Sequence, residues 1–411
     1  MDKRERRKED KPCGPEGRRS RSRWRRWTVN LSLAAGGCFL ALLIVEVILR
    51  LVFYFPQPQF LEIDDVVGHR HRPGISGYYV QEGFSKFTIN SHGFLDREYS
   101  VEKSPGVFRI AVLGDSFAEA IQIDLDQTFH EILERRLKRT EVLNFGVSGF
   151  GTAQELLAYR QYARPFSPDL VLVAFCSAND LSDNSKALAG GYPRPYYYLR
   201  DGQLQLDNGF RQSRRHRVMS RIGPLYYFLS DHSALVQHLD QWRRNAGRQN
   251  RARRLEEQRQ EKEPQAIEPG LSRGVYGPPA TLELEAAWEL TERLFLELNR
   301  AVRDDGATLT LVTVTVTMQV DPAMRAQVER DHPDWDLDYL DRRVGEFAEA
   351  NGIPCLMLAP DLLEYSRRTQ RRLHGFGNVA KGHWNAEGHR VVADRLYDFL
   401  AERNLVPPEH R

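Results

Sequence analysis

Cysteine is scarce in this sequence, with four residues among 411, and the four are dispersed. Cys13 lies in a basic leader and Cys38 in an apolar run, whereas Cys176 and Cys355 lie within short apolar segments typical of strands. This number and spacing argue against a disulfide framework or a cysteine metal site, and Cys176 and Cys355 are expected to be buried thiols.

Long hydrophobic runs are also lacking, with one exception near the start, and this argues against a polytopic membrane protein. The exception, "LSLAAGGCFLALLIV", begins at Leu31 and carries no charge, and its apolar character continues to Phe55. Residues 28–55 are long enough to cross a bilayer as one helix. Glu46 and Arg50, which interrupt the run, are four residues apart and can pair near the membrane interface.

No large excess of one charge sign is present, since the net charge is +2. The balance is uneven along the chain, because the first 26 residues carry about seven more basic than acidic residues. The positive-inside rule then predicts that the leader, residues 1–27, stays in the cytoplasm and that everything after Pro56 is exported, to the periplasm or the cell exterior. The exported part is mildly acidic, so nucleic acid is not an expected partner.

Two other interpretations of the apolar run are weaker. A cleaved signal peptide would have an unusually long basic region, and no small-x-small cleavage site follows the run. A buried core helix would need a cover that the basic leader cannot supply. The sequence therefore favours an uncleaved anchor that holds the protein in the cytoplasmic membrane by a single span.

The alternation of strands and helices predicts the fold. Residues 56–107, rich in proline, glycine and aromatic residues, are a lead-in segment expected to pack on the main domain. Residues 108–402 alternate short apolar strands with amphipathic helices, which predicts a three-layer α/β/α sandwich around a parallel sheet. The expected strands are 108–113, 141–146, 168–176, 308–317 and 354–358; the expected helices are 129–139, 153–163, 282–302, 340–352 and 385–403.

The alternation fails in residues 181–279, which are interpreted as an insertion over one edge of the sheet. It contains a predicted hairpin with Asp201 and Gly202 at the turn. It also contains a charged run, 243–265, in which basic and acidic residues are mixed, as in a solvated helix or linker. The insertion is expected to influence the choice of substrate, because it leaves the sheet near the strand ends where ligands bind in such folds.

The stretch "RIAVLGDSFAEA", residues 109–120, places Ser116 at a corner between a strand and a helix. A serine there either caps the helix or acts as a nucleophile beside unpaired backbone N–H groups. Three further segments follow other strand ends or precede the last helix: "NFGVSGFG" with Gly149, "FCSANDLSDN" with Asn179, and "KGHWNAEGH" with His383. Together they offer a nucleophile, two oxyanion donors and a base.

These four segments, in this order, resemble the blocks of the SGNH hydrolases, also called the GDSL esterase/lipase family. The resemblance covers about residues 108–180 and 308–402. It implies a flavodoxin-like parallel sheet, Ser116 as the nucleophile, His383 as the base, and an oxyanion hole formed by Ser116, Gly149 and Asn179. The third block departs slightly, because Ser177 and Ala178 precede Asn179 where the family has Gly-x-Asn-Asp.

A second departure concerns the acid of the catalytic triad. Family members place an aspartate three residues before the histidine, and this position holds Ala380. The group that orients His383 is therefore unidentified in the sequence. It could be a backbone carbonyl, which would leave a serine–histidine dyad, or an acid from elsewhere such as Glu387.

The functional expectation is a membrane-anchored serine esterase that acts outside the cytoplasmic membrane on an ester-bearing carbohydrate or lipid. Neither a metal nor an organic cofactor is implied. One alternative is an O-acetyltransferase that modifies a cell-envelope polysaccharide, which shares the acyl-enzyme step. Another is a non-catalytic envelope binding module, an interpretation that the missing aspartate leaves open.

Overall fold

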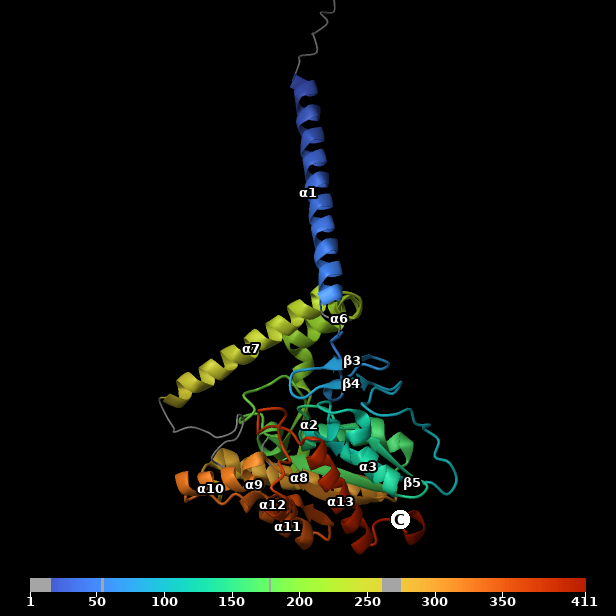
Figure 1. Ribbon diagram of the computed structural model, residues 1–411, viewed down its shortest axis with the longest axis vertical. Coiled ribbons are helices and arrows are strands. Elements are labelled where there is room, and N and C mark those ends of the chain that lie inside the picture. The colour runs from blue at the N-terminus through green and yellow to red at the C-terminus, as the bar shows by residue number, and fades with distance from the viewer. Residues whose placement is uncertain (1–15, 53–54, 177–178, 261–274) are drawn as a thin grey trace, which may run out of the picture.

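A parallel five-stranded sheet forms the centre of the protein, which we describe from a computed structural model over residues 16–52, 55–176, 179–260 and 275–411 (Figure 1). The strand order is β11-β10-β7-β5-β6, with every neighbouring pair parallel. In chain order this is the 2-1-3-4-5 arrangement of flavodoxin-like folds, so the fold class expected from the sequence is confirmed. The strands are β5 (Phe108–Gly114), β6 (Thr140–Asn144), β7 (Leu170–Cys176), β10 (Thr308–Val314) and β11 (Cys355–Met357).

The sheet strands are apolar on both faces because helices cover both. Along β7, Val171 and Val173 pack in one core with the helices of one layer, and Leu170 and Leu172 pack in a second core with those of the other. The first layer is α4 (Thr152–Ala158), α8 (Leu282–Asp304) and α11 (Tyr339–Ala350). The second is α3 (Phe129–Arg136), α12 (Leu358–Thr369) and α13 (Ala386–Glu402).

The five expected strands and the five expected helices are all present, and most of their ends lie within three residues of the predicted ones. Outside the insertion, the helices that the sequence analysis missed are the short α9 (Thr317–Val320), together with α10 (Pro322–Asp331) and α12; within the insertion it missed α5 (Asp180–Asn184) and α6 (Arg214–His232). The first two follow β10 and the third follows β11 with no intervening loop. At the β10–α9 and β11–α12 junctions, apolar strand and apolar helix merge into one run in which periodicity cannot mark the change. α10 was missed for another reason, because it is short and buries only Val328.

The lead-in segment forms two small antiparallel sheets, β1 (Leu61–Asp64) with β2 (Gly68–His71), and β3 (Ser76–Tyr79) with β4 (Ser85–Thr88). Phe87, Ile89 and Leu95 of this segment form a small core with Ile121, which lies just after the first helix of the main domain. The lead-in segment therefore packs on the main domain, as expected.

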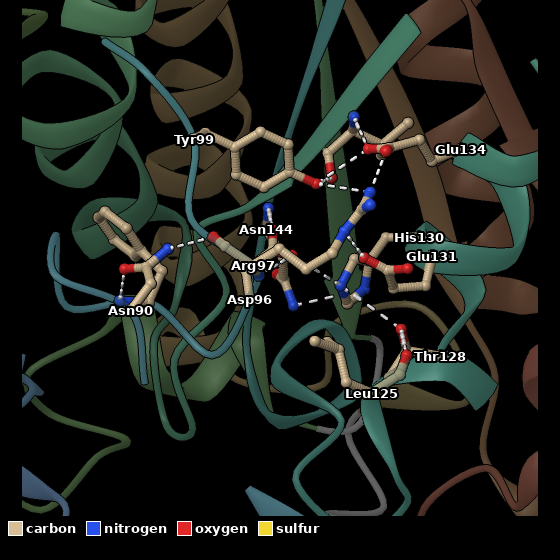
Figure 2. Close-up of polar contacts among 12 residues, drawn as sticks. Asn90, Asp96, Arg97, Tyr99, Leu125, Thr128, His130, Glu131, Glu134 and Asn144 are labelled. Carbon is tan, nitrogen blue, oxygen red and sulfur yellow. Dashed lines mark hydrogen bonds and ion pairs between the residues drawn. The ribbon is translucent and has the colours of Figure 1, made fainter. Parts of the chain in front are cut away.

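A polar network beyond these sheets also fixes the lead-in segment to the main domain (Figure 2). The Asp96 carboxylate accepts a hydrogen bond from the backbone N–H of Asn144, at the end of β6, at 2.7 Å. The Arg97 guanidinium forms ion pairs with Glu131 and Glu134 of α3. Because the carboxylates of Asp96, Glu131 and Glu134 are largely buried and each bonds a partner on the other segment, they hold the lead-in chain in one position relative to the sheet.

The N-terminal helix and the helices of the insertion meet near the top of the domain (Figure 1). The N-terminal helix α1 spans Glu16–Val52, and its stretch Trp24–Val52 is long and apolar enough to cross a membrane. The insertion contains α5 (Asp180–Asn184), the hairpin of β8 (Tyr196–Arg200) and β9 (Gln203–Asp207), α6 (Arg214–His232) and α7 (Ala234–Gln260). The predicted turn at Asp201 and Gly202 is confirmed, since both have positive φ.

The insertion lies mainly against the lead-in segment and the foot of α1. Gln59 donates its backbone N–H to Ser230 of α6, and Arg72 forms an ion pair with Asp231 at 2.7 Å. The charged run begins within α7, and the part of that run in residues 261–274 lies outside the described residues. The first 15 residues of the leader and the third-block residues Ser177 and Ala178 also lie outside them.

Candidate active site

Ser116 lies at the carboxyl end of β5, as the first residue of the single-turn helix α2 (Ser116–Glu119). The turn is closed by Asp115, whose carboxylate accepts a hydrogen bond from the backbone N–H of Phe117 at 2.9 Å. The capping function that the sequence left open for Ser116 is therefore performed by Asp115. The Ser116 hydroxyl is half-buried and free of that structural task.

His383 lies just before α13, and its imidazole contacts Ser116. Its Nε2 is 2.7 Å from Ser116 Oγ, although the two residues are 267 positions apart in the chain. The Phe117 ring packs on the imidazole, with 4.8 Å between the ring centroids. The structure thus brings together the two residues for which the sequence predicts nucleophile and base.

The acid beside His383 is Glu82, in the loop between β3 and β4 of the lead-in segment. Glu82 Oε2 is 2.7 Å from His383 Nδ1, and Glu82 Oε1 accepts a hydrogen bond from the His383 backbone N–H at 2.8 Å. Gly382 makes this close approach possible, since a Cβ at that position would lie 2.1 Å from Glu82 Oε1. Ser116, His383 and Glu82 form a continuous hydrogen-bonded chain.

The two ionisable groups of this chain shift each other's pKa. Burial by itself lowers the pKa of His383, but the hydrogen bond to Glu82 and its negative charge outweigh burial, so the pKa is raised above 6.5. Burial by itself raises the pKa of Glu82, but the hydrogen bonds from His383 dominate and the net pKa is lowered. Glu82 is therefore ionised at neutral pH and stabilises a proton on His383.

The two candidates that the sequence offered for orienting His383 are both wrong. Glu387 lies in the first turn of α13 and pairs with Arg390 and Arg371, and it also accepts a hydrogen bond from Tyr365. Its carboxylate is thus already committed on the surface of the domain. A backbone carbonyl is not the partner either, because His383 Nδ1 contacts a carboxylate.

The orientation of the peptide bond between Ser148 and Gly149 is fixed by contacts of Ser148. The Ser148 carbonyl lies 3.0 Å from His69 Nε2, which must be the donor because a carbonyl only accepts. Burial lowers the pKa of His69 to about 4, so the ring is neutral at pH 7. In a trans peptide the N–H points opposite to the C=O, so His69 also fixes the direction of the Gly149 N–H. Gly149 itself has φ of 80°, which favours glycine.

Glu119, the last residue of α2, holds Ser148 through its hydroxyl and through the N–H of the preceding peptide. Its carboxylate accepts hydrogen bonds from the Ser148 hydroxyl and from the Ser148 backbone N–H, the latter at 3.2 Å, and it lies 2.5 Å from His71 Nε2. Both Glu119 and His71 are fully buried. Burial by itself raises the pKa of Glu119, but the hydrogen bonds with His71 and Ser148 lower it by more, so the net pKa is lowered.

Glu119→Gln is expected to lower kcat for a small ester by about 10- to 100-fold with little change in KM, because a misdirected oxyanion donor affects mainly the transition state. Steady-state kinetics with an aryl acetate, together with the melting temperature, would test this. A lower melting temperature with an unchanged kcat of the folded protein would mean that Glu119 acts only in folding. Glu98→Gln, a lead-in glutamate bound to Ser91 far from this peptide, is the matched control.

Asn179, the third predicted oxyanion residue, precedes α5 and is half-buried. Its side-chain amide donates to Asp115 at 3.1 Å and lies 3.4 Å from Asp183. Asp115 thus binds both the turn at Ser116 and the Asn179 amide, and it holds the loops after β5 and β7 next to each other. The contact with Asp183 is the longer of the two. If the amide hydrogen that makes it turned toward the substrate, Asn179 would donate to an oxyanion.

A cavity of about 700 Å³ adjoins this site. Its lining includes Ser148 and Gly149, the lead-in residue His69, Arg194 and residues of α6 and α7. Arg194 is almost fully buried and donates a hydrogen bond to the Gly149 carbonyl at 2.9 Å. The insertion thus contributes walls to a space next to the predicted oxyanion residue.

Two neighbours of His383 in the segment "KGHWNAEGH" are structural. Trp384 is buried in the core, and its indole N–H donates to Thr315. His389 is also buried, stacks on Phe129 and accepts a hydrogen bond from the Phe129 backbone N–H at 3.3 Å.

Within the described residues, Asp96, His130 and Glu131 lie close enough to share a metal ion. We interpret this cluster as an ion-pair network, because Arg97 already lies 2.6 Å from Glu131 (Figure 2).

The sequence analysis missed the contribution of the lead-in segment to the site, namely Glu82, His69 and His71. The signal that could have indicated it was Ala380, because a missing acid implies either a dyad or an acid from another segment. The lead-in segment, residues 56–107, was the exported part to which the sequence analysis had assigned no function in the site. No periodicity or spacing, however, points to Glu82 among its several acidic residues.

No family model matches the chain, and none of the curated proteins matches it in sequence. Among solved structures it is similar to a catalytic mutant of an acetylxylan esterase from Geobacillus stearothermophilus, with 12% identity and a TM-score of 0.37 over 73% of this chain and 96% of that one. It is also similar to a lipase/acylhydrolase from Enterococcus faecalis, with 11% identity and a TM-score of 0.35 over 72% and 97% of the two chains.

A third similar structure is a member of the lipolytic G-D-S-L family from Veillonella parvula, with 12% identity and a TM-score of 0.36 over 71% of this chain and 97% of that one. All three identities are far below those of close relatives. The function proposed below therefore rests on the geometry of this chain.

Proposed function

We propose that the protein is a serine esterase in which Ser116 is the nucleophile, His383 the general base and Glu82 the acid of a triad. The observation that carries this proposal is the chain of two 2.7 Å contacts, from Ser116 Oγ to His383 Nε2 and from His383 Nδ1 to Glu82. A hydroxyl is a weak nucleophile unless an adjacent base accepts its proton, and the base is effective only when a third group orients it.

The reaction follows from these positions. Ser116 Oγ attacks the ester carbonyl while its proton passes to His383, whose imidazolium is stabilised by ionised Glu82. The negative charge on the carbonyl oxygen is taken up by the backbone N–H groups of Ser116 and Gly149 and by the Asn179 amide. His383 then gives its proton to the leaving alcohol, and an acyl-enzyme remains. Water, deprotonated by His383, hydrolyses the acyl-enzyme and frees Ser116.

The cavity beside Gly149 is the space in which we place the rest of the ester substrate. Its volume of about 700 Å³ lies in the range of small-molecule sites. Its lining combines Arg215, His216 and Arg244 with apolar and aromatic residues such as Ile63, Met219 and Tyr226, so it offers positive charge to polar or anionic groups beside an apolar wall. This favours an ester carried by a carbohydrate or a polar headgroup.

The experiment that tests the esterase proposal is release of acetate from a small aryl acetate by the full-length protein in detergent. Labelling by an alkyl fluorophosphonate, which reacts with activated serines, is measured in parallel. Turnover together with labelling of Ser116 is expected. Absence of both would contradict the proposal and favour the non-catalytic binding module.

The acyl-enzyme step is shared by the alternative, an O-acetyltransferase that moves the acyl group to an envelope polysaccharide. The open cavity beside Gly149 could admit such an acceptor. Adding candidate polysaccharides to the aryl acetate assay separates the two functions. A hydrolase keeps the same rate and releases only acetate, whereas a transferase accelerates and delivers acetyl groups to the sugar.

We also propose that α1 anchors the protein in the cytoplasmic membrane with residues after Pro56 outside. The support is the apolar stretch Trp24–Val52 and the excess of basic residues before it. Alkaline phosphatase fused after residue 60 is expected to be active in a bacterial host, because this enzyme matures only after export. An inactive fusion, with an active cytoplasmic reporter at the same position, would overturn this topology.

A further inference from the structure

The foot of α1 is joined to the insertion by polar contacts. Glu46 accepts hydrogen bonds from the Ser233 hydroxyl and from the backbone N–H groups of Ala234 and Leu235, at 2.8 to 3.0 Å. These are N–H groups at the start of α7 that lack a partner within the helix. Arg50, which pairs with Glu46 at 2.7 Å, donates to the carbonyl of His232 at the end of α6. The two charges that interrupt the apolar run thus cap the α6–α7 turn.

These contacts set the height of the turn relative to the anchor. Glu46 precedes the last residue of α1, Val52, by six positions, which is about 9 Å along a helix. The turn between α6 and α7 therefore lies beside α1, and not beyond its end. If α1 crosses the membrane as proposed, the turn reaches the depth of the last turns of the span.

The side chains around this turn have the character of a membrane contact. On α6, an apolar stripe is formed by Val218, Ile222, Leu225 and Leu229, which recur every three or four residues and thus share one face. All four are exposed, Leu225 to 64%, and Phe228 beside them is exposed as well. The opposite face of α6, with His216, Gly223 and Ser230, is the buried one. The stripe is therefore not used to pack α6 on the rest of the described domain.

The distribution of charge on α6 matches an interfacial position. Its four arginines, Arg214, Arg215, Arg217 and Arg221, lie in the half of the helix distant from the turn. The half close to the turn carries no arginine and exposes Leu225, Phe228 and Leu229. At the start of α7, Leu239 and Trp242 are three residues apart and also exposed, Trp242 to 70%. Apolar residues near the span, basic residues farther out and an exposed tryptophan are typical of a helix that lies in a lipid interface.

The catalytic acid lies on the same side of the domain. Phe84, two residues after Glu82, is 55% exposed, and its ring is 5.1 Å from that of Phe55, just after the end of α1. Tyr78 of β3 packs on both rings. In Figure 1, β3 and β4 lie directly below the foot of α1, next to α6. The loop that carries Glu82 is thus tied to the anchor by an aromatic cluster.

We propose that the α6–α7 turn and the apolar stripe of α6 insert into the lipid bilayer interface beside α1, so that the domain rests on the membrane with the Glu82 loop facing it. The occupant of this apolar face is lipid, because the face is continuous with the span and the contacts of Glu46 and Arg50 fix it there. The proposal rests on the proposed anchoring by α1, and it does not depend on the esterase reaction.

Nitroxide labelling of the full-length protein in phosphatidylcholine–phosphatidylglycerol vesicles tests the proposal. Cys13→Ser and Cys38→Ser remove the reactive thiols of the leader and α1, and single cysteines are then introduced as Leu225→Cys, Leu40→Cys or Leu282→Cys. Leu40 lies within the span, and Leu282, 80% exposed at the start of α8, is the control on the domain. Collision rates with oxygen and with a water-soluble nickel chelate report the depth of each label.

The label at Leu225 is expected to show an oxygen-to-nickel collision ratio several-fold above that at Leu282 and below that at Leu40. Equal ratios at Leu225 and Leu282, with a high ratio at Leu40, would overturn the inserted turn and leave the anchor intact. A low ratio at Leu40 would overturn both. Since all three sites are exposed, the substitutions leave the packed core unchanged, and none of the outcomes depends on turnover.

Discussion

Replacing Ser116 with alanine is expected to lower kcat/KM for an aryl acetate by about 10⁴-fold or more, and His383→Ala by a similar factor. In the proposed mechanism either change removes the same covalent step, because Ser116 would carry the acyl group and His383 would make its hydroxyl nucleophilic. The double variant is therefore expected to lose little more than either single one. Initial rates of acetate release, with the melting temperature as a measure of folding, test this.

Two substitutions outside the site serve as matched controls. Ser220→Ala removes a hydroxyl that bonds only within α6, and His410→Ala removes an imidazole that contacts Lys138 near the C-terminus. Both are expected to keep wild-type rates. Wild-type turnover by Ser116→Ala would refute the serine mechanism. If Ser116→Ala also restored the phenotype of a deletion strain, the non-catalytic binding module would replace the esterase.

Glu82→Gln is expected to lower kcat by about 10²- to 10⁴-fold, because an amide can still bond His383 but cannot stabilise its protonated form. This is the sharpest test of the structure, since the sequence resemblance assigns no role to Glu82. The control is Glu98→Gln, another lead-in glutamate, which bonds Ser91 and is distant from the site. Equal activity of Glu82→Gln and Glu98→Gln would leave a serine–histidine dyad.

The pH profile gives an independent readout of the same contact. His383 must be neutral to accept a proton, so kcat/KM rises with pH through the pKa of His383, which Glu82 raises above 6.5. In Glu82→Gln the negative charge is gone and the burial that lowers the pKa remains. The rising limb should therefore move to lower pH while its plateau falls. An unchanged midpoint would show that Glu82 does not act on His383.

The proposed acid also changes how the resemblance to SGNH hydrolases is understood. Ala380 stands where the family has an aspartate, and this departure left the competence of the site open. Glu82 reaches the same imidazole nitrogen from 301 positions earlier in the chain. We therefore interpret the alanine as a relocation of the acid to the lead-in segment, and not as a sign of a degenerate site.

The sequence by itself determined the scaffold. Strand and helix periodicity located β5, β6, β7, β10 and β11 along the chain, because burial on both faces makes each strand a short apolar run. It also placed Ser116, Gly149 and Asn179 together, since the carboxyl ends of parallel strands meet at one edge of the sheet. His383 was found by its motif before the last helix. The apolar run of α1 was equally plain, because length and composition alone define it.

Only the tertiary structure decided what the irregular segments do. Glu82, His69 and Glu46 each act across a large sequence separation, through side chains whose partners no local pattern specifies. Glu82 reaches His383 because the lead-in segment folds back over the strand ends and is held there by ion pairs such as Arg97 with Glu131. Loop closure of this kind depends on packing, and packing has no period in the sequence.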